Sequence, residues 1–231
     1  MKTLKHHLKQ SLTMVVIMLS AIGWAQNCSE YFPMTPGTTY EITHYDKKNS
    51  IESVTHNEVL SASGNKAEIH TVVKDNAGSE TLNATYEMLC ENDGVTIDFN
   101  SLIGKRLASE LKDKDMDVKI DGTNFYLPNK LEKGQTLPDT NMNMDIDAGS
   151  MAMNFKVSTI NRKVTGKETI TVPAGTFDCI IIESETTLKM LITKHTVSKK
   201  WLAKGVGVVK TENYKKNGKL DSSEVLTAFN K

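Results

Sequence analysis

The sequence lacks the short motifs that carry the commoner enzyme chemistries. It contains no Gly-x-Ser-x-Gly elbow, which excludes the nucleophile arrangement of the α/β-hydrolases. It has neither His-Glu-x-x-His nor Cys-x-x-Cys, so the usual spacings of zinc ligands are missing. It also has no glycine-rich loop of the kind that cradles phosphate. These absences predict a protein that is not an enzyme. A polymer hydrolase with unidentified catalytic residues stays an alternative.

An excess of basic charge is missing as well. The 28 lysines and arginines are matched by 28 aspartates and glutamates. A protein that binds nucleic acid presents a basic surface to the phosphates, so this balance argues against such a partner. The hydrophobic content of 39% is enough to build an ordinary core. No linker, repeat or low-complexity run divides the chain, which predicts one domain.

The longest apolar run lies near the amino terminus and is too short to cross a bilayer. Residues 12–22 are almost entirely apolar, follow a lysine-containing start, and precede Gly23 and Ala25. A basic start, a short apolar centre and small residues before the cut are typical of a cleaved export signal. A membrane-spanning helix needs about 20 apolar residues. We therefore predict a signal peptide at residues 1–25, no membrane span after its removal, and a periplasmic or extracellular location for residues 26–231.

Three cysteines follow the predicted cleavage site. Export permits a disulfide, and an odd number of cysteines leaves at least one thiol over. If one bridge forms, we expect it between Cys28 and Cys90, where it would tie the amino-terminal segment to a strand. Cys179 stands in the apolar run of residues 179–182 and is expected to be a small buried hydrophobic residue.

Apolar and polar residues alternate through most of the remaining chain. Residues 81–90 and 95–99 show this alternation on either side of Asn-Asp-Gly, a sequence typical of tight turns. About a dozen such segments, which include 151–159, 168–172 and 191–201, predict an antiparallel all-β fold. Only residues 101–112 have apolar side chains near helical spacing, which predicts one short helix. The expected architecture is a large curved sheet forming a closed or half-open barrel, with a two-sheet sandwich as the alternative.

Four segments of the sequence carry a resemblance to a known family. They are Thr171-Val-Pro-Ala-Gly-Thr-Phe-Asp-Cys179, Trp201-Leu-Ala-Lys-Gly-Val-Gly-Val-Val-Lys210, Cys28-Ser-Glu-Tyr-Phe-Pro33 and Tyr45-Asp-Lys-Lys48. In these segments the chain resembles the TapB-like proteins, a family of exported proteins of unknown function that is common in Bacteroidetes. The resemblance implies a partly open antiparallel β-barrel, similar in outline to the envelope lipoprotein carriers of the LolA and LolB kind. It brings no established catalytic residues with it.

Methionines flank one of the predicted hairpin turns. Met142 and Met144 precede the turn, and Met151 and Met153 follow it. Alternation places each pair on one face of its strand, so four thioether sulfurs can converge. Soft sulfur ligands suit Cu(I), which makes a copper-handling protein one hypothesis. The same geometry also describes an apolar wall of adaptable side chains, because Ile146 and Phe155 continue the two rows.

The leading hypothesis from the sequence is a non-enzymatic protein of the cell envelope. It would bind an apolar or amphipathic, lipid-like molecule in the mouth of the curved sheet, or act as an interaction module. No cofactor is expected. The residues predicted to contact the ligand are Met142, Met144, Met151, Met153, Phe155 and Trp201.

Overall fold

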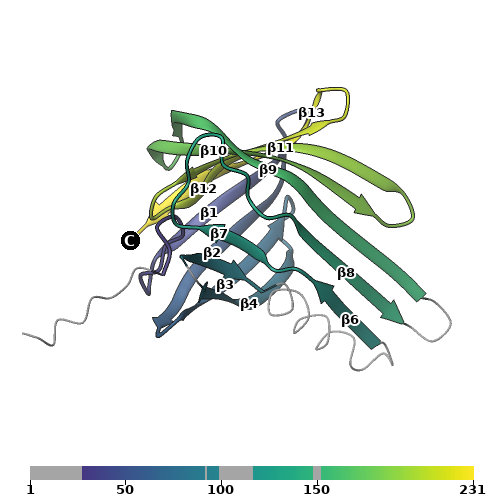
Figure 1. Ribbon diagram of the computed structural model, residues 1–231, viewed down its shortest axis with the longest axis horizontal. Helices are drawn as coiled ribbons and strands as arrows, with labels where there is room; N and C mark the ends of the chain where they lie inside the picture. The colour runs from purple at the N-terminus through teal and green to yellow at the C-terminus, as the bar shows by residue number, and fades with distance from the viewer. Residues whose placement is uncertain (1–27, 92, 99–116, 148–151) are drawn as a thin grey trace, which may run out of the picture.

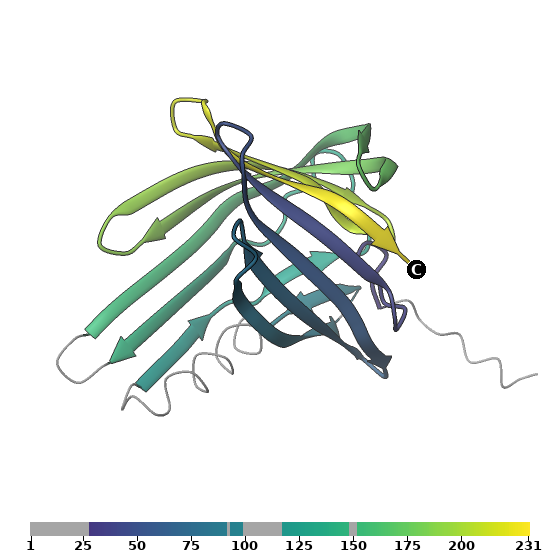
Figure 2. The same cartoon turned by 180° about the vertical axis from the view of Figure 1, so that it is seen from behind.

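The computed structural model describes residues 28–91, 93–98, 117–147 and 152–231 (Figure 1). Within these residues the chain forms one antiparallel sheet of 13 strands, in the order β6-β8-β9-β10-β11-β12-β13-β1-β2-β3-β4-β5-β7. The sheet bends into a half-open curve, which both views show (Figure 1, Figure 2). The predicted all-β curved sheet is thereby confirmed. The predicted signal peptide and the predicted helix at 101–112 lie outside the described residues.

Most strands follow one another through short turns, as the sequence predicts. In the described part of the chain, no helix has the length and hydrophobicity to cross a membrane. The strands are β1 Thr39–Asp46, β2 Ile51–Ser63, β3 Lys66–Asp75, β4 Glu80–Glu91, β5 Gly94–Ile97, β6 Asp117–Gly122, β7 Phe125–Pro128, β8 Thr140–Asp147, β9 Ala152–Val172, β10 Gly175–Lys189, β11 Thr193–Ala203, β12 Gly207–Lys215 and β13 Leu220–Asn230.

The two edge strands of the sheet, β6 and β7, are consecutive in the chain. β6 ends at Gly122 and β7 begins at Phe125, so the chain passes from one edge to the other within a few residues. The amide of Thr123 donates to the carbonyl of Asn141 at 2.8 Å and holds this crossing in place. Gly122 has φ +141°, and a Cβ there would lie 2.2 Å from the Asn141 carbonyl oxygen. Only glycine fits this close approach.

Strand β10 buries side chains on both of its faces. Ile180 and Ile182 belong to one hydrophobic cluster, while Cys179 and Ile181 belong to another. Successive side chains of a strand point to opposite faces, so the two clusters lie on the two sides of β10. A strand covered on both sides has a continuous apolar run in place of an alternating one. This explains the unbroken apolar stretch at residues 179–182.

The first of these clusters fills the concave side of the sheet. It draws side chains from two facing wings, one made of β2–β5 with β7 and the other of β9–β11. We call it the concave cluster. Its buried members are Tyr31, Val59, Ala67, Ile69, Met88, Val95, Leu127, Leu131, Leu137, Val164, Ile180, Ile182 and Leu202.

A buried arginine joins the two wings. Arg162 on β9 is 2% exposed. Its Nη1 donates to the carbonyl of Pro138 at 2.5 Å, and its Nη2 donates to the carbonyl of Tyr126 on β7 at 3.1 Å. Its guanidinium also lies 4.4 Å from the centre of the Phe125 ring, a cation–π contact. Burial lowers the pKa of Arg162 to about 10, against an opposing effect of Asp139, so the side chain stays charged at neutral pH.

The loop after β7 extends the pairing of β9. The amide of Gly134 donates to the carbonyl of Val164 at 2.8 Å, and the amide of Leu137 donates to the carbonyl of Arg162 at 2.8 Å. Strand β9 therefore pairs with β8 along its first part and with this loop further on. The sequence predicted separate strands at 151–159 and 168–172. The structure shows one strand that bends at Asn161, which has φ 55°, and at two register shifts against β10.

Replacement of Arg162 by Met should lower the free energy of unfolding by about 2–4 kcal/mol, because the carbonyls of Tyr126 and Pro138 would lose their charged donor. Urea denaturation followed by circular dichroism measures the change. Lys163→Met, at the exposed neighbouring position, is the matched control and should shift this free energy by less than about 0.5 kcal/mol. Equal losses in the two variants would show that Arg162 does not hold the wings together.

Candidate functional site

The register of the sheet gathers apolar side chains from four neighbouring strands on one face. Residues directly opposite each other on antiparallel strands project to the same side. Met144 lies opposite Phe155 on β9 and Ile120 on β6, and Val157 lies opposite Leu188 on β10. We call this set the apolar arm face. It consists of Val118, Ile120, Met142, Met144, Ile146, Met153, Phe155, Val157 and Leu188.

The apolar arm face continues the concave side of the sheet. Leu188 and Ile182 both occupy even positions of β10, which pairs with β11 without a register shift, and Ile182 belongs to the concave cluster. In Figure 1, β6, β8 and β9 reach out from the rest of the sheet as an arm. Ile146 is buried, whereas Met144 and Phe155 are only half-buried. This part of the concave side is therefore apolar, but its side chains are not fully buried as those of the core are.

Three of the four methionines predicted to act together lie on this face, but none of them faces another. Met142 is opposite Val157, Met144 is opposite Phe155, and Met153 is opposite Ile146. The register thus interleaves each sulfur with a branched or aromatic side chain, a packing that suits methionine well. Met151 lies outside the described residues, so the copper hypothesis stays a prediction. Among the residues that are described, no group of three or more His, Cys, Asp or Glu side chains could hold a metal ion.

Trp201 lies on the other face of the sheet. It is 4% exposed on β11, directly opposite Ile181 of the second hydrophobic cluster. Its Nε1 donates to Glu168 Oε2 at 2.8 Å, and the ammonium groups of Lys199 and Lys210 lie 4.5 and 5.2 Å from its ring centre. The structure therefore does not bring Trp201 to the methionines. These contacts give its indole a polar partner at the edge and cations over the ring.

A pocket of about 480 Å³ lies towards the far end of β9 and β10 from the arm, and we call it the rim pocket. Its two carboxylates come from opposite faces of this strand pair, because Glu168 lies opposite Cys179 and Asp178 lies opposite Thr169. They are therefore not arranged as a facing acid–base pair. The lining residues are Tyr31, Lys167, Glu168, Thr169, Asp178, Cys179, Ile180, Leu202 and Lys204.

Two groups that line the rim pocket, the Tyr31 hydroxyl and the Cys179 thiol, are not activated as nucleophiles. Burial raises the pKa of Tyr31 to about 12, with a smaller contribution from Glu30. Burial, helped by the charges of Asp178 and Glu168, raises the pKa of Cys179 to about 11. A catalytic nucleophile needs a lowered pKa or an adjacent base. Both groups therefore stay protonated at neutral pH.

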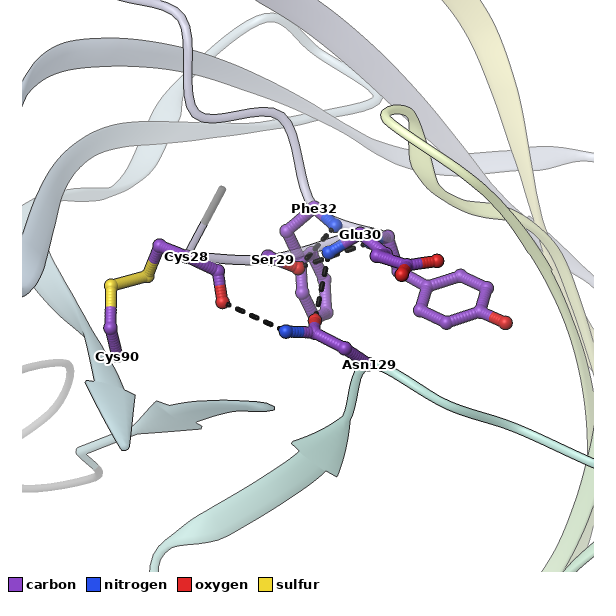
Figure 3. Close-up of a disulfide and its surroundings, with 7 residues drawn as sticks. Cys28, Ser29, Glu30, Phe32, Cys90 and Asn129 are labelled. Atoms are coloured by element: carbon purple, nitrogen blue, oxygen red, sulfur yellow. Dashed lines mark hydrogen bonds between the residues drawn. A yellow bond between two sulfur atoms is a disulfide. The ribbon is translucent and has the colours of Figure 1, made fainter. Parts of the chain in front are cut away.

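The amino-terminal segment that supplies Tyr31 is tied to the sheet by a disulfide (Figure 3). Cys28 is bonded to Cys90 at the end of β4, with the two Cα atoms 5.1 Å apart. The side chain of Asn129 supports the same segment: its Oδ1 accepts from the amide of Glu30 at 2.8 Å, and its Nδ2 donates to the carbonyl of Cys28 at 3.4 Å. The third cysteine, Cys179, is buried and free.

A local turn then directs Tyr31 into the core. Ser29 Oγ accepts from the amides of Tyr31 and Phe32 at 3.1 and 2.8 Å. The carbonyl of Glu30 accepts from the amide of Gly205 at 2.8 Å, and its carboxylate pairs with Lys204. Tyr31 is 2% exposed as a result and closes one end of the concave cluster. Sequence reasoning missed this role of Tyr31, and only its place three residues after Cys28 hinted at it.

The chain belongs to the DUF3108-like family, whose sequence profile matches residues 35–226. The match confirms that the chain belongs to a family of unknown function, while the TapB-like grouping and a Bacteroidetes source stay predictions. A comparison with curated proteins finds no match.

Two solved structures are similar to this chain. One, from Bacteroides fragilis NCTC 9343, is described as a candidate exported protein with a YmcC-like fold. It has a TM-score of 0.71 and 19% identity, and the match covers 88% of this chain and all of that one. The other, from Parabacteroides distasonis ATCC 8503, is described as a candidate lipoprotein. Its TM-score is 0.67 and its identity 24%, and the match covers 89% of this chain and all of that one. At these identities the likeness shows the fold alone.

Loss of the disulfide should lower the free energy of unfolding by about 2–4 kcal/mol, because the bond closes a long loop in the unfolded chain. The bridged cysteines are 62 residues apart. The test replaces Cys28 and Cys90 by serine and measures urea unfolding at neutral pH. A reductant should destabilise the unaltered protein and leave the double variant unchanged. Equal stability of the two proteins would contradict a structural role for the bridge.

Cys179 should resist alkylation while the protein is folded. Its raised pKa of about 11 shifts thiolate formation to higher pH, so little thiolate is present under mildly alkaline conditions. Mass spectrometry after iodoacetamide treatment should find Cys179 unmodified in the native protein and modified in urea. Fast labelling of the native protein would contradict its burial.

Proposed function

We propose that this member of the DUF3108-like family is a non-enzymatic protein of the cell envelope that binds one apolar or amphipathic molecule on its concave side. The apolar arm face is the observation that carries this proposal. Its central side chains, Met144 and Phe155, are half-buried although the face consists of apolar residues alone. A bound apolar molecule would complete their burial, which stabilises the complex by roughly 25 cal/mol for each Å² removed from water.

The opposite side of the same strands supports this assignment. Lys119 on β6 lies opposite Asp145 on β8, and Lys156 on β9 is exposed. These charged residues alternate along the chain with those of the apolar arm face, so charge lies on one side and apolar side chains on the other. An antiparallel sheet with this pattern has one solvated face and one that packs against apolar material.

The chemistry of the face favours a ligand with a flexible apolar part. Met142, Met144 and Met153 have unbranched side chains with polarisable sulfur, and such residues adapt to ligands of different shape. No charged residue belongs to the apolar arm face, and the charged residue that borders it on the same side is Lys194 of β11, directly opposite Leu188. A polar headgroup, if the ligand has one, would lie towards the open edge.

Three further observations support an envelope location. Residues 1–25 have the composition of an export signal. The Cys28–Cys90 disulfide is a bond typical of oxidising compartments outside the cytoplasm. Two proteins of the same fold are described as a candidate exported protein and a candidate lipoprotein. Together these favour the periplasm or the cell exterior.

A charge placed within the apolar arm face should weaken ligand binding. With cis-parinaric acid, a fluorescent fatty acid, as the probe, the unaltered protein should give saturable fluorescence enhancement. Met144→Lys should weaken the affinity by about tenfold or more, because its ammonium would lose hydration beside the bound chain. The matched control is Asn143→Lys, which adds the same charge on the other side of β8 and should leave the affinity unchanged.

This experiment can fail in two clear ways. Absence of saturable binding by the unaltered protein would argue against an apolar ligand of this size. Equal loss in Met144→Lys and Asn143→Lys would place the bound probe elsewhere. Circular dichroism of each variant checks that the fold is kept.

A further inference from the structure

The turn between β10 and β11 exposes three apolar side chains in succession. Leu191 is 102% exposed, Ile192 79% and Met190 48%, and the first two are the most exposed large hydrophobic side chains in the described part of the chain. The sequence had predicted a strand from residue 191 onwards. In the structure β11 begins at Thr193, and the amide of Met190 donates to the carbonyl of Ile192 at 3.1 Å across the turn. We call residues 190–192 the apolar tip.

Folding of the chain itself does not account for the apolar tip. Apolar side chains scattered singly over a surface are ordinary, but three in a row on a projecting hairpin have an unfavourable exposure that nothing in the sheet relieves. In Figure 1 the turn lies at the free end of the hairpin, on the same side of the molecule as the ends of β8 and β9. The tip is therefore placed to meet something outside the protein.

Lysines surround the apolar tip. Lys189 and Lys194 flank it in the chain, and Lys156 of β9 lies directly opposite Lys189. The turn from β12 to β13 is next in the sheet, since Lys215 lies opposite Thr196 of β11. Residues 189–195 and 214–221 together contain five lysines and one acidic residue. That residue, Asp221, is shared between Lys194 at 2.7 Å and Lys215 at 3.4 Å.

This local positive charge stands out in a chain with no net charge. The lysines favour binding to an anionic partner, while the apolar tip favours contact with an apolar one. Three side chains on a narrow turn are far too small for a stable protein–protein interface, which buries about 800 Å² on each partner. The boundary of a lipid bilayer supplies both requirements at once, with apolar chains below a layer of anionic headgroups.

We propose that the β10–β11 turn docks the protein onto an anionic lipid bilayer. Met190, Leu191 and Ile192 enter the interface between headgroups and acyl chains, and the surrounding lysines lie at the level of the phosphates. The attachment is peripheral and reversible, because the inserted apolar area is small.

The apolar tip also adjoins the proposed ligand site. Leu188, the last member of the apolar arm face on β10, is two residues from Met190, and Val157 lies opposite it. A molecule leaving the bilayer beside the tip would therefore meet the apolar arm face first. Exchange of ligand with the membrane at this point rests on the proposed function, whereas docking does not.

Flotation with vesicles of phosphatidylcholine, with and without phosphatidylglycerol, tests the docking. The purified protein should float with the anionic vesicles, and less of it should do so in high salt, which screens the lysines. The double variant Leu191→Asp/Ile192→Asp should bind these vesicles at least about tenfold more weakly. Leu60→Asp is the matched control, since Leu60 is 46% exposed on β2, five strands away from β10 in the sheet order, and it should bind normally.

Failure of docking can be told apart from failure of the proposed function by a second measurement. The tip variant should still bind cis-parinaric acid in solution, and Met144→Lys should still float with anionic vesicles. Flotation of the tip variant like the unaltered protein, equal loss in Leu60→Asp, or no flotation at all would overturn the docking. Absence of parinarate binding with normal flotation would overturn only the ligand site.

Discussion

The hydrogen bonds from the buried guanidinium of Arg162 to backbone carbonyl oxygens hold the sheet in its curved shape. A guanidinium buried in the sheet is stable only while its donors are satisfied. Here one donor reaches the carbonyl of Tyr126 on the other side of the curve, and another reaches that of Pro138 in the loop beside β9. The wing that carries β9 and the wing that carries β7 therefore cannot separate at this level without leaving a charge unpaired. The short chain segment between β6 and β7 also connects the two edge strands of the sheet covalently. A long antiparallel sheet is in this way bent into a half-open curve and held there.

Arg162 also marks a boundary along β9. On one side of it, Val164 belongs to the concave cluster, where both wings contribute side chains and the core is closed. On the other side, Met153, Phe155 and Val157 belong to the apolar arm face. One face of one strand thus serves as core at one end and as an accessible apolar surface at the other. The apolar tip, which lysines flank in the chain, lies beside that accessible end. The proposals for ligand binding and for membrane docking both follow from this difference between the two ends of β9.

Much of the fold could be predicted because alternation is a property of neighbouring residues. Period-two patterns and Asn- or Asp-containing turns predicted an antiparallel curved sheet, and they placed Met142, Met144 and Ile146 on one side of their strand. The predicted strand boundaries were wrong where the polar or apolar character of a few neighbouring residues did not match their place in the sheet. Asn161-Arg162-Lys163 looks like a break between strands, but Arg162 is drawn inward by distant carbonyls and β9 continues through it. Leu191 and Ile192 look like strand residues, yet they lie at a turn whose position depends on the pairing of β10 with β11.

The sequence by itself determined the all-β class and the faces of single strands, because both depend on residue types and on spacings of a few residues. Only the tertiary structure decided which faces meet. Trp201 and Met144 both look like members of an apolar wall, but the register from β8 to β11 puts them on opposite sides of the sheet. The contact of Arg162 with Tyr126 brings together residues 36 positions apart, on strands that are not neighbours in the sheet. Such a contact forms only when the whole sheet bends, and no local pattern shows which side chains the bend brings together.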